Sequence, residues 1–428
     1  MTSAEQSLAG RAPADSIHAA TSTSSGMVSS ADAAHFSYIE AIYGLMDRKL
    51  TDYLEVELAA FLRLFPVSVH VPAARYLQGR VALAAGDDHR ACALFMKTLF
   101  LHPQAAAHAQ AAEGARMVVT TNKYYQDSRN ELLLQINGEF LPGEPEDLHY
   151  DYISFLQGWN HDKLQQWCLT EYQEFFSLYP SDPRSEKVLH WIAETYTALK
   201  QHREAAASYS KFEYLFPASN LVPAVRIRRA EILSEKLKDP DLAVAALTTV
   251  LAEYPQTSVA GTALFMRAQI KADKLKDYIG AGNDYQQLAA SMPQHARSVD
   301  ALLAQAELQA KKLKQYPEAV DVYDEIVKRY PRDLKCVTAL EEAGEILLDK
   351  LHQPVSAAAR YARLADIFPD NEMAPESLLK AARICQDKAK NFDLATGYYQ
   401  RLVEAYPRTD QAREARQKLD ELRTQAAD

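Results

Sequence analysis

Apolar residues recur along most of the chain at spacings of three and four residues, with polar residues between them. This spacing is typical of amphipathic α-helices, because residues three and four apart share one helical face. A proline closes each apolar stretch. Proline removes a helical hydrogen bond and pushes the residue before it out of the helical region. The pattern therefore predicts an all-α fold in which each of these prolines follows the end of a helix.

The closing prolines keep a regular interval. They are Pro66, Pro103, Pro142, Pro180, Pro217, Pro255, Pro293, Pro331, Pro369 and Pro407. The successive differences between their positions are 37, 39, 38, 37, 38, 38, 38, 38 and 38. An interval that is kept over so many steps indicates a structural repeat, here with a period of about 38 residues.

Three further positions keep the same phase and lie on one face of the helix that precedes each proline. Twelve residues before the proline the residue is small: Ala91, Cys168, Ala205, Ala243, Ala281, Ala319, Ala357 and Ala395. Eight before it the residue is large and mostly aromatic: Phe95, Tyr172, Tyr209, Leu247, Tyr285, Tyr323, Tyr361 and Tyr399. Five before it the residue is apolar again: Phe175, Phe212, Val250, Leu288, Ile326, Leu364 and Leu402. We expect these side chains to form the core of each unit.

A second helix is predicted upstream in each unit. Its marker is a small residue, found at Gly79, Ala193, Ala230, Ala268, Ala306, Gly344 and Ala382. A short basic turn joins the two helices in several units, as in Lys274-Leu275-Lys276 and Lys312-Leu313-Lys314. Cations at the end of a helix complement its partial negative charge. Each unit is therefore predicted to be a pair of helices.

With these positions, the sequence resembles the tetratricopeptide repeat family, whose unit is a pair of antiparallel helices. The resemblance covers about residues 35–420 and implies a right-handed α-solenoid of about ten helix pairs. The units that end at Pro217 through Pro407 match the family's small, aromatic and proline positions closely, although they are longer than the roughly 34 residues of the standard unit. In the unit that ends at Pro142, Asn130 stands where alanine is expected. We expect broken geometry over residues 104–170.

The chain is predicted to divide into four parts. Residues 1–34 form a flexible tail rich in alanine, serine and threonine, residues 35–142 hold degenerate repeats, residues 143–407 hold regular repeats, and residues 408–428 form a capping helix and a tail. The capping helix is indicated by Ala412, Ala415, Leu419 and Leu422 at helical spacing. A cap is needed because the last unit of a repeat array otherwise exposes an apolar face.

Charge and composition narrow the function. The 57 acidic residues outnumber the 47 basic ones, so the formal net charge is -10, which argues against non-specific nucleic-acid binding. Charged residues or prolines interrupt every long apolar stretch, so no membrane span is predicted. The four cysteines, Cys92, Cys168, Cys336 and Cys385, lack the spacing of a metal site or a disulfide framework and are expected to be packed thiols.

No catalytic motif is present. The sequence contains no glycine-rich phosphate loop, no HExxH and no GxSxG, and its twelve histidines, including His149 and His161, show no metal-ligand spacing. We therefore expect a protein that is not an enzyme and that has no cofactor, no metal and no small-molecule substrate.

The resemblance also implies a row of candidate partner-binding residues. In the family the first helix of each pair lines the groove, and the residue after its small residue tends to point inward. Those positions hold Glu194, Glu231, Gln269, Glu307, Glu345 and Arg383. One interpretation is an acidic row that binds a basic segment of a partner protein. The other is that they are ordinary solvated positions of an acidic protein.

Several aromatic residues fall outside the repeat phase. They are Tyr124, Tyr125, Tyr150, Tyr152, Trp159 and Trp167. They are interpreted either as anchors of a second binding surface around residues 104–170 or as irregular local packing.

The resemblance implies a non-catalytic scaffold or adaptor that holds a partner segment in the groove of the solenoid. The alternative is a structural spacer of a multi-protein assembly or a regulatory subunit of an enzyme complex. The long unit and the Tyr-Pro or Phe-Pro endings are similar to tetratricopeptide proteins of the bacterial cell envelope, such as the Tol-Pal coordinator and the outer-membrane assembly lipoprotein. The start of the sequence has neither a secretory signal nor a lipid-attachment cysteine. We therefore expect a cytoplasmic location, with the periplasm as the alternative.

Overall fold

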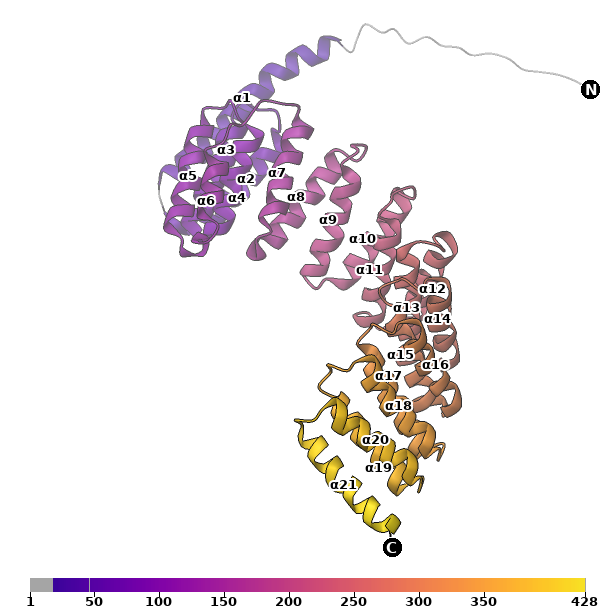
Figure 1. Cartoon of the computed structure of the whole chain (residues 1–428). Coiled ribbons are helices and arrows are strands. Elements are labelled where there is room, and N and C mark those ends of the chain that lie inside the picture. Colours follow the sequence, from indigo (N-terminus) through magenta and orange to yellow (C-terminus); the bar gives the residue numbers. More distant parts are fainter. Residues whose placement is uncertain (1–17, 46, 428) are drawn as a thin grey trace, which may run out of the picture. The chain divides into compact units, whose positions relative to one another are not determined.

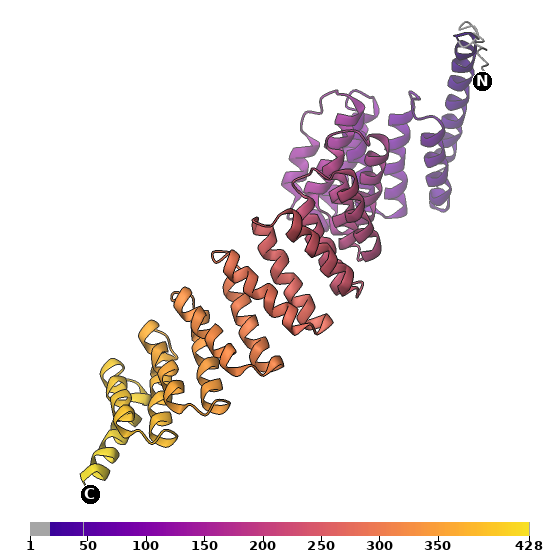
Figure 2. The same ribbon diagram turned by 90° about the vertical axis from the view of Figure 1, so that its right-hand side faces the viewer.

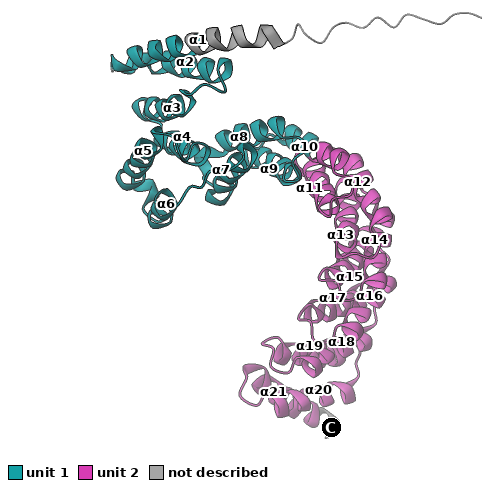
Figure 3. Cartoon of the chain, turned by 90° about the horizontal axis from the view of Figure 1, so that it is seen from above, with its two compact units in different colours: residues 1–208 teal, residues 209–428 magenta. Residues whose placement is uncertain are grey.

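The computed structural model describes residues 18–45 and 47–427, and in these ranges it contains α-helices, short 3₁₀ and π turns and no β-strand. The predicted all-α class is confirmed. The chain forms two compact units, residues 1–208 and residues 209–428 (Figure 3). Figure 1 labels the helices, and α1 to α20 follow one another as ten helix-turn-helix units.

Unit 1 contains helices α1 to α9 and the start of α10. They are α1 (His18–Gly44), α2 (Thr51–Leu64), α3 (Val71–Ala85), α4 (Asp88–Leu101), α5 (Ala107–Thr121), α6 (Arg129–Ile136), α7 (Pro145–Trp159), α8 (Gln165–Leu178), α9 (Ser185–Ala198) and α10 (His202–Leu215), of which α10 ends in unit 2. Helix α1 overlaps the tail predicted for residues 1–34, because residues 18–34 are helical. Alanine, frequent in this segment, is the strongest helix former. The rest of that prediction, residues 1–17, lies outside the described chain.

The remaining helices belong to unit 2. They are α11 (Val222–Glu235), α12 (Pro240–Glu253), α13 (Ser258–Ile270), α14 (Tyr278–Ser291), α15 (Ser298–Leu308), α16 (Tyr316–Arg329), α17 (Lys335–Asp349), α18 (Pro354–Ile367), α19 (Ala374–Asp387), α20 (Phe392–Ala405) and α21 (Asp410–Ala427). Each packs against the next, and Figure 2 shows the pairs following one another down to the carboxyl end. The side chains by which α21 packs are Ala412, Ala415, Leu419 and Leu422, all buried.

The aromatic residue eight positions before each proline lies in the core of its pair. Tyr323, Tyr361 and Tyr399 are each 1% exposed or less. The small residue of the first helix makes room for this ring. A Cβ atom on Gly344 would lie 2.7 Å from Cζ of Tyr361, and one on Gly79 would lie 2.5 Å from Cε1 of Phe95. Close approach of the two helices therefore depends on both positions together.

The basic turns adopt a left-handed backbone. Their last residue has φ between 53° and 60° at Lys200, Lys238, Lys276, Lys314, His352 and Lys390, one in each successive repeat. The following residue bonds back to the end of the first helix: the amide of Asp277 donates to the carbonyl of Lys271 at 2.8 Å. The same Asp277 then caps the second helix, since its Oδ1 accepts from the amide of Gly280 at 2.9 Å. One pair of residues thus ends one helix and starts the next.

Neighbouring pairs of unit 2 are also joined at their prolines. The hydroxyl of Tyr330 donates to the carbonyl of Pro293 at 2.9 Å, and the hydroxyl of Tyr406 donates to that of Pro369 at 2.8 Å. These tyrosines directly precede Pro331 and Pro407. In these two places the Tyr-Pro ending therefore links one repeat to the one before it.

Unit 1 departs from this regular order where broken geometry was predicted. Helix α4 packs against α3, α5 and α7, so that α7 bypasses the short α6 and returns to α4. The ring of Phe95 explains how α3 and α5 both approach α4. It faces Gly79 on α3 and Gly114 on α5, where a Cβ atom would lie 2.5 Å and 2.8 Å from the ring. As a result α4 is surrounded, and all nine residues from Ala91 to Leu99 are buried.

Two further findings complete the fold. All four cysteines are free and buried, as expected for packed thiols. Among the described residues, no helix combines the length and the apolar character needed to cross a membrane.

Candidate partner-binding sites

The predicted row lies on the first helices of successive pairs in unit 2. Helices α11, α13, α15, α17 and α19 follow the inner side of the curve of this unit (Figure 3). They carry Glu231, Gln269, Glu307, Glu345 and Arg383, whose side chains are half-buried or exposed. The small residue before each of them is buried, so the helix turns the next residue toward solvent. The sixth predicted residue, Glu194, lies on α9 of unit 1 and is 37% exposed.

The charges of this row are partly compensated by nearby cations. Arg228 lies 2.5 Å from Glu231, Lys311 lies 3.6 Å from Glu307, and Lys380 lies 3.7 Å from Glu345, in each case between a side-chain nitrogen and a carboxylate oxygen. Arg383 pairs with Glu414 of α21 at 2.5 Å. Exposed ion pairs of this kind contribute little to stability and exchange partners readily. The row is therefore a mixed-charge surface rather than a purely acidic one.

The structure brings two of the predicted residues into one pocket. Glu231 and Gln269 line a pocket of about 210 Å³ between α11 and α13, with Glu235 and Asp273 beside them. Three carboxylates thus surround this pocket, and the one cation that lines it, Lys274, pairs with Glu235 at 3.1 Å. The local charge favours a cationic group. Glu307, Glu345 and Arg383 do not line this pocket.

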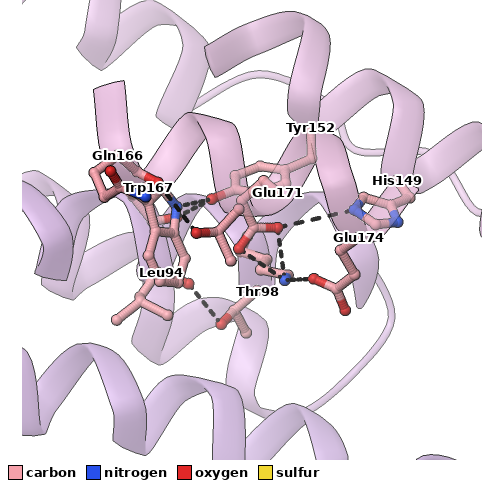
Figure 4. Close-up of polar contacts among 11 residues, drawn as sticks. Leu94, Thr98, His149, Tyr152, Gln166, Trp167, Glu171 and Glu174 are labelled. Carbon is pink, nitrogen blue, oxygen red and sulfur yellow. Dashed lines mark hydrogen bonds and ion pairs between the residues drawn. The ribbon is translucent and has the colours of Figure 1, made fainter. Parts of the chain in front are cut away.

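A buried charged cluster in unit 1 was not predicted from the sequence. Lys97 stands in the buried stretch of α4, and its side chain is 5% exposed. Its Nζ lies 2.9 Å from Oε1 and 2.7 Å from Oε2 of Glu171, and it donates to Oε2 of Glu174 at 2.9 Å. Figure 4 shows the two carboxylates, both from α8, converging on one point. A buried ammonium group needs such partners because its transfer out of water is costly.

Helix α7 completes this cluster. Nε2 of His149 lies 3.8 Å from Oε2 of Glu171, and this buried nitrogen has no hydrogen-bond partner among the described residues (Figure 4). The hydroxyl of Tyr152 donates to the carbonyl of Ala93 at 3.1 Å and accepts from Nε1 of Trp167 at 3.0 Å. These contacts fix α7 and α8 to α4. One feature of the sequence hints at this cluster. Lys97 is the single charged residue in the run from Ala91 to Leu101, which is otherwise apolar except for Thr98.

The off-phase aromatic residues are mainly packing residues. Tyr125 and Tyr152 are fully buried. Nδ1 of His89 lies 2.7 Å from the hydroxyl of Tyr125, and the ring of His161 lies 4.5 Å from that of His89. Burial is the main cause that lowers the pKa of His161 to about 4. Tyr124 is the exception, because it is 46% exposed.

A cleft of about 830 Å³ opens beside the charged cluster. Its walls come from α2, α3, α4, α7 and α8 and include Arg75, Lys97, His102, Glu171 and Glu174. Burial, followed by the positive charges of Arg75 and Lys97, lowers the pKa of His102 to about 4. Burial alone would raise the pKa of Glu174, but Lys97 and then Arg75 hold it below its usual value. His102 is therefore neutral and Glu174 ionised near neutral pH.

One group of possible metal ligands occurs in this cleft. His149, Glu171 and Glu174 each offer a ligand atom, and these atoms lie within 4.8 Å of one another. The ammonium of Lys97, however, contacts both carboxylates and takes the place of a cation there. A divalent ion bound to all three groups would lie against this positive charge. We assign no metal to the cluster.

Comparison with known proteins identifies the repeat. The family model described as tetratricopeptide repeat matches residues 225–257, 300–333 and 376–409, which correspond to the pairs α11–α12, α15–α16 and α19–α20. The intervening pairs α13–α14 and α17–α18 have the same period and the same core positions. The three matched segments of unit 2 are therefore tetratricopeptide repeats, a kind of repeat that generally serves as a protein-interaction scaffold.

The solved structures that are similar to this chain include two that are described as tetratricopeptide repeat proteins. One from Parabacteroides merdae is 15% identical over 64% of this chain and 96% of that chain, with a TM-score of 0.34. One from Cytophaga hutchinsonii is 13% identical over 62% of this chain and 98% of that chain, with a TM-score of 0.39. A third similar structure, that of yeast Tom70, is 15% identical over 93% of this chain and 89% of that chain, with a TM-score of 0.32. No curated protein matches the sequence of the chain.

Proposed function

We propose that the protein is a non-catalytic scaffold that holds a segment of a partner protein on the first helices of unit 2. The observation that carries this proposal is the pocket between α11 and α13, where Glu231, Glu235 and Asp273 gather beside Gln269. The same face continues over α15 and α17 with Glu307 and Glu345. Repeat stacks of this type commonly present an extended surface to a partner segment.

The chemistry of the pocket favours a basic partner segment. A lysine or arginine of the partner would pair with the carboxylates of Glu231 and Asp273, which both line this pocket. Arg228 and Lys380 now pair with Glu231 and Glu345 on this face. A cation of the partner would take their place, so that one exposed ion pair replaces another. Such pairs act mainly on the rate of association and on the choice of partner.

The test compares two triple charge reversals in the full chain. Glu231→Lys, Glu307→Lys and Glu345→Lys change the row, while Asp241→Lys, Asp321→Lys and Glu404→Lys change exposed positions of the second helices α12, α16 and α20. We expect the first triple variant to lose the co-purified partner and the second to keep it, with similar melting temperatures. Equal recovery by both variants would refute the row as a binding site.

The dependence of partner binding on the salt concentration distinguishes this function from the role of a structural spacer. Binding through the row should weaken as the salt concentration rises, because exposed charges are screened within roughly 8 to 10 Å. Recovery of a partner that is insensitive to salt and to both triple variants would instead support an apolar assembly interface.

A further inference from the structure

The cleft of unit 1 contains a cation that forms no ion pair with the described residues, although its charge acts on nearby Glu174. Arg75 on α3 is half-buried, its buried Nε has no hydrogen-bond partner, and no ion pair of the described residues includes it. Lys97, in contrast, is held between Glu171 and Glu174. An arginine presents five donors in a planar fork, and burying them unpaired is unfavourable. The geometry therefore leaves a place for an acceptor beside Arg75.

The balance of charge in the cleft identifies the kind of acceptor. The charged residues that line the cleft are three cations, Arg63, Arg75 and Lys97, and two carboxylates, Glu171 and Glu174. His102 adds a buried Nε2 that has no partner among the described residues and carries no charge near neutral pH. The cleft thus has a positive excess inside a protein whose formal net charge is -10. A planar carboxylate matches the fork of Arg75 through two parallel hydrogen bonds.

The walls of the cleft indicate that the carboxylate belongs to a protein segment. Leu62, Leu101, Leu148 and Leu178 line the cleft, and Leu178 is 57% exposed. Pro66 also lines the cleft, and Val67, the residue after it, is 93% exposed. Apolar side chains that stay open to solvent around a charged centre are typical of a protein interface, where they exclude water from the central contact.

We propose that this cleft binds an acidic segment of a partner protein, in which one carboxylate pairs with Arg75 and the neighbouring apolar side chains pack on Leu62, Leu101 and Leu148. The site is separate from the row of unit 2 and prefers the opposite charge. The protein would then hold two segments at once, a basic one on unit 2 and an acidic one on unit 1. Lys97 acts as a positioning residue, since it keeps Glu171 and Glu174 neutralised next to the incoming carboxylate.

The test uses fluorescein-labelled peptides and the full chain. One peptide alternates aspartate and leucine, a second replaces each aspartate by asparagine, and a third replaces it by lysine. We expect the aspartate peptide to bind at least about tenfold more tightly than the asparagine peptide, as measured by fluorescence anisotropy at low salt. Arg75→Gln should abolish this difference. Arg413→Gln, at a position 73% exposed on α21, should preserve it.

Several results would overturn the proposal. Equal binding of the aspartate and asparagine peptides would remove the role of the carboxylate, and unchanged binding by Arg75→Gln would remove the role of this arginine. A stoichiometric divalent metal in the purified protein that is lost in His149→Asn would make the cleft a metal centre instead. If circular dichroism shows that Arg75→Gln fails to fold, Arg63→Gln at the rim takes its place and should give a smaller loss. The triple variant of Glu231, Glu307 and Glu345 should still bind the aspartate peptide, which separates this test from that of the proposed function.

Discussion

At the scale of single residues, the fold depends on positions that recur in phase with the prolines. Tyr323 illustrates this, because its ring is fully buried while its hydroxyl has no hydrogen-bond partner among the described residues. The ring therefore stabilises the helix pair by burial alone. The sequence could predict this position, since a helical period fixes which side chains face inward.

Tyr323→Ala should lower the free energy of unfolding by about 3 to 5 kcal/mol, as for other buried aromatic side chains. Tyr323→Phe should be close to neutral, because only a hydroxyl without a partner is removed. The control Tyr214→Ala changes a ring that is 84% exposed and should also be neutral. Thermal melting followed by circular dichroism measures all three. A neutral Tyr323→Ala would show that the core position is misassigned.

The buried cluster around Lys97 predicts a different pattern of stability. Lys97→Met leaves the carboxylate of Glu171, which is 2% exposed, without a cation, and should cost about 3 to 5 kcal/mol. The double change Lys97→Met with Glu171→Met should recover most of this loss, because it removes the buried charge as well. Tryptophan fluorescence during urea unfolding reports on this region, since Trp159, Trp167 and Trp191 all lie in unit 1. A double variant no more stable than the single one would contradict the account.

The histidines of unit 1 predict a loss of stability in acid. The pKa values of His102 and His161 are lowered to about 4 in the folded protein, against a usual value of 6.5. Between pH 6.5 and 4 the unfolded chain therefore binds protons that the folded chain does not, so stability falls as the pH falls through this window. The full effect is about 3 kcal/mol for each histidine.

His102→Asn and His161→Asn should each flatten the dependence of the melting temperature on pH between 6.5 and 4. Above pH 7 neither histidine contributes to the slope, because it is neutral in both states. Melting curves of the two variants and the unchanged chain over this range provide the measurement. A slope identical in all three proteins would show that these histidines titrate normally.

At the scale of helices, the turn within each pair combines a left-handed residue with a cap. The sequence predicted the basic character of this turn but not its backbone, because lysine gives no sign of a positive φ, which glycine adopts more readily. The regular spacing of Lys200 through Lys390 shows that the geometry of the turn is repeated although its residues vary.

Lys314→Gly should raise the free energy of unfolding by up to about 1 kcal/mol, because glycine adopts a φ of 58° without steric cost. Lys314→Val should lower it by about 1 to 2 kcal/mol, since a β-branched residue is strained there. Circular dichroism melting of both variants gives the order. The opposite order, with valine more stable than glycine, would contradict the left-handed turn.

At the scale of the whole chain, the repeat pattern predicted the helix pairs, and the row stays a prediction, while the cluster of unit 1 could not be predicted. Lys97 and Glu171 are 74 residues apart, and they meet only because α7 bypasses α6 and packs on α4. Local periodicity does not reveal that packing, since it depends on how α3 and α5 fit around Phe95. The positions of the row, in contrast, recur once in each of six successive repeats and follow from the spacing within the helix pair.

The proposal that the first helices of unit 2 hold the partner is tested most directly by site-specific photo-cross-linking in the cell. A photoreactive residue at Gln269 on α13 lies in the pocket of the row, whereas one at Leu242 on α12, 56% exposed, lies on a second helix. We expect cross-links from Gln269 to one segment of one partner, rich in lysine or arginine, and none to that segment from Leu242. Cross-links to the same segment from Leu242 alone, or from both positions equally, would contradict the account.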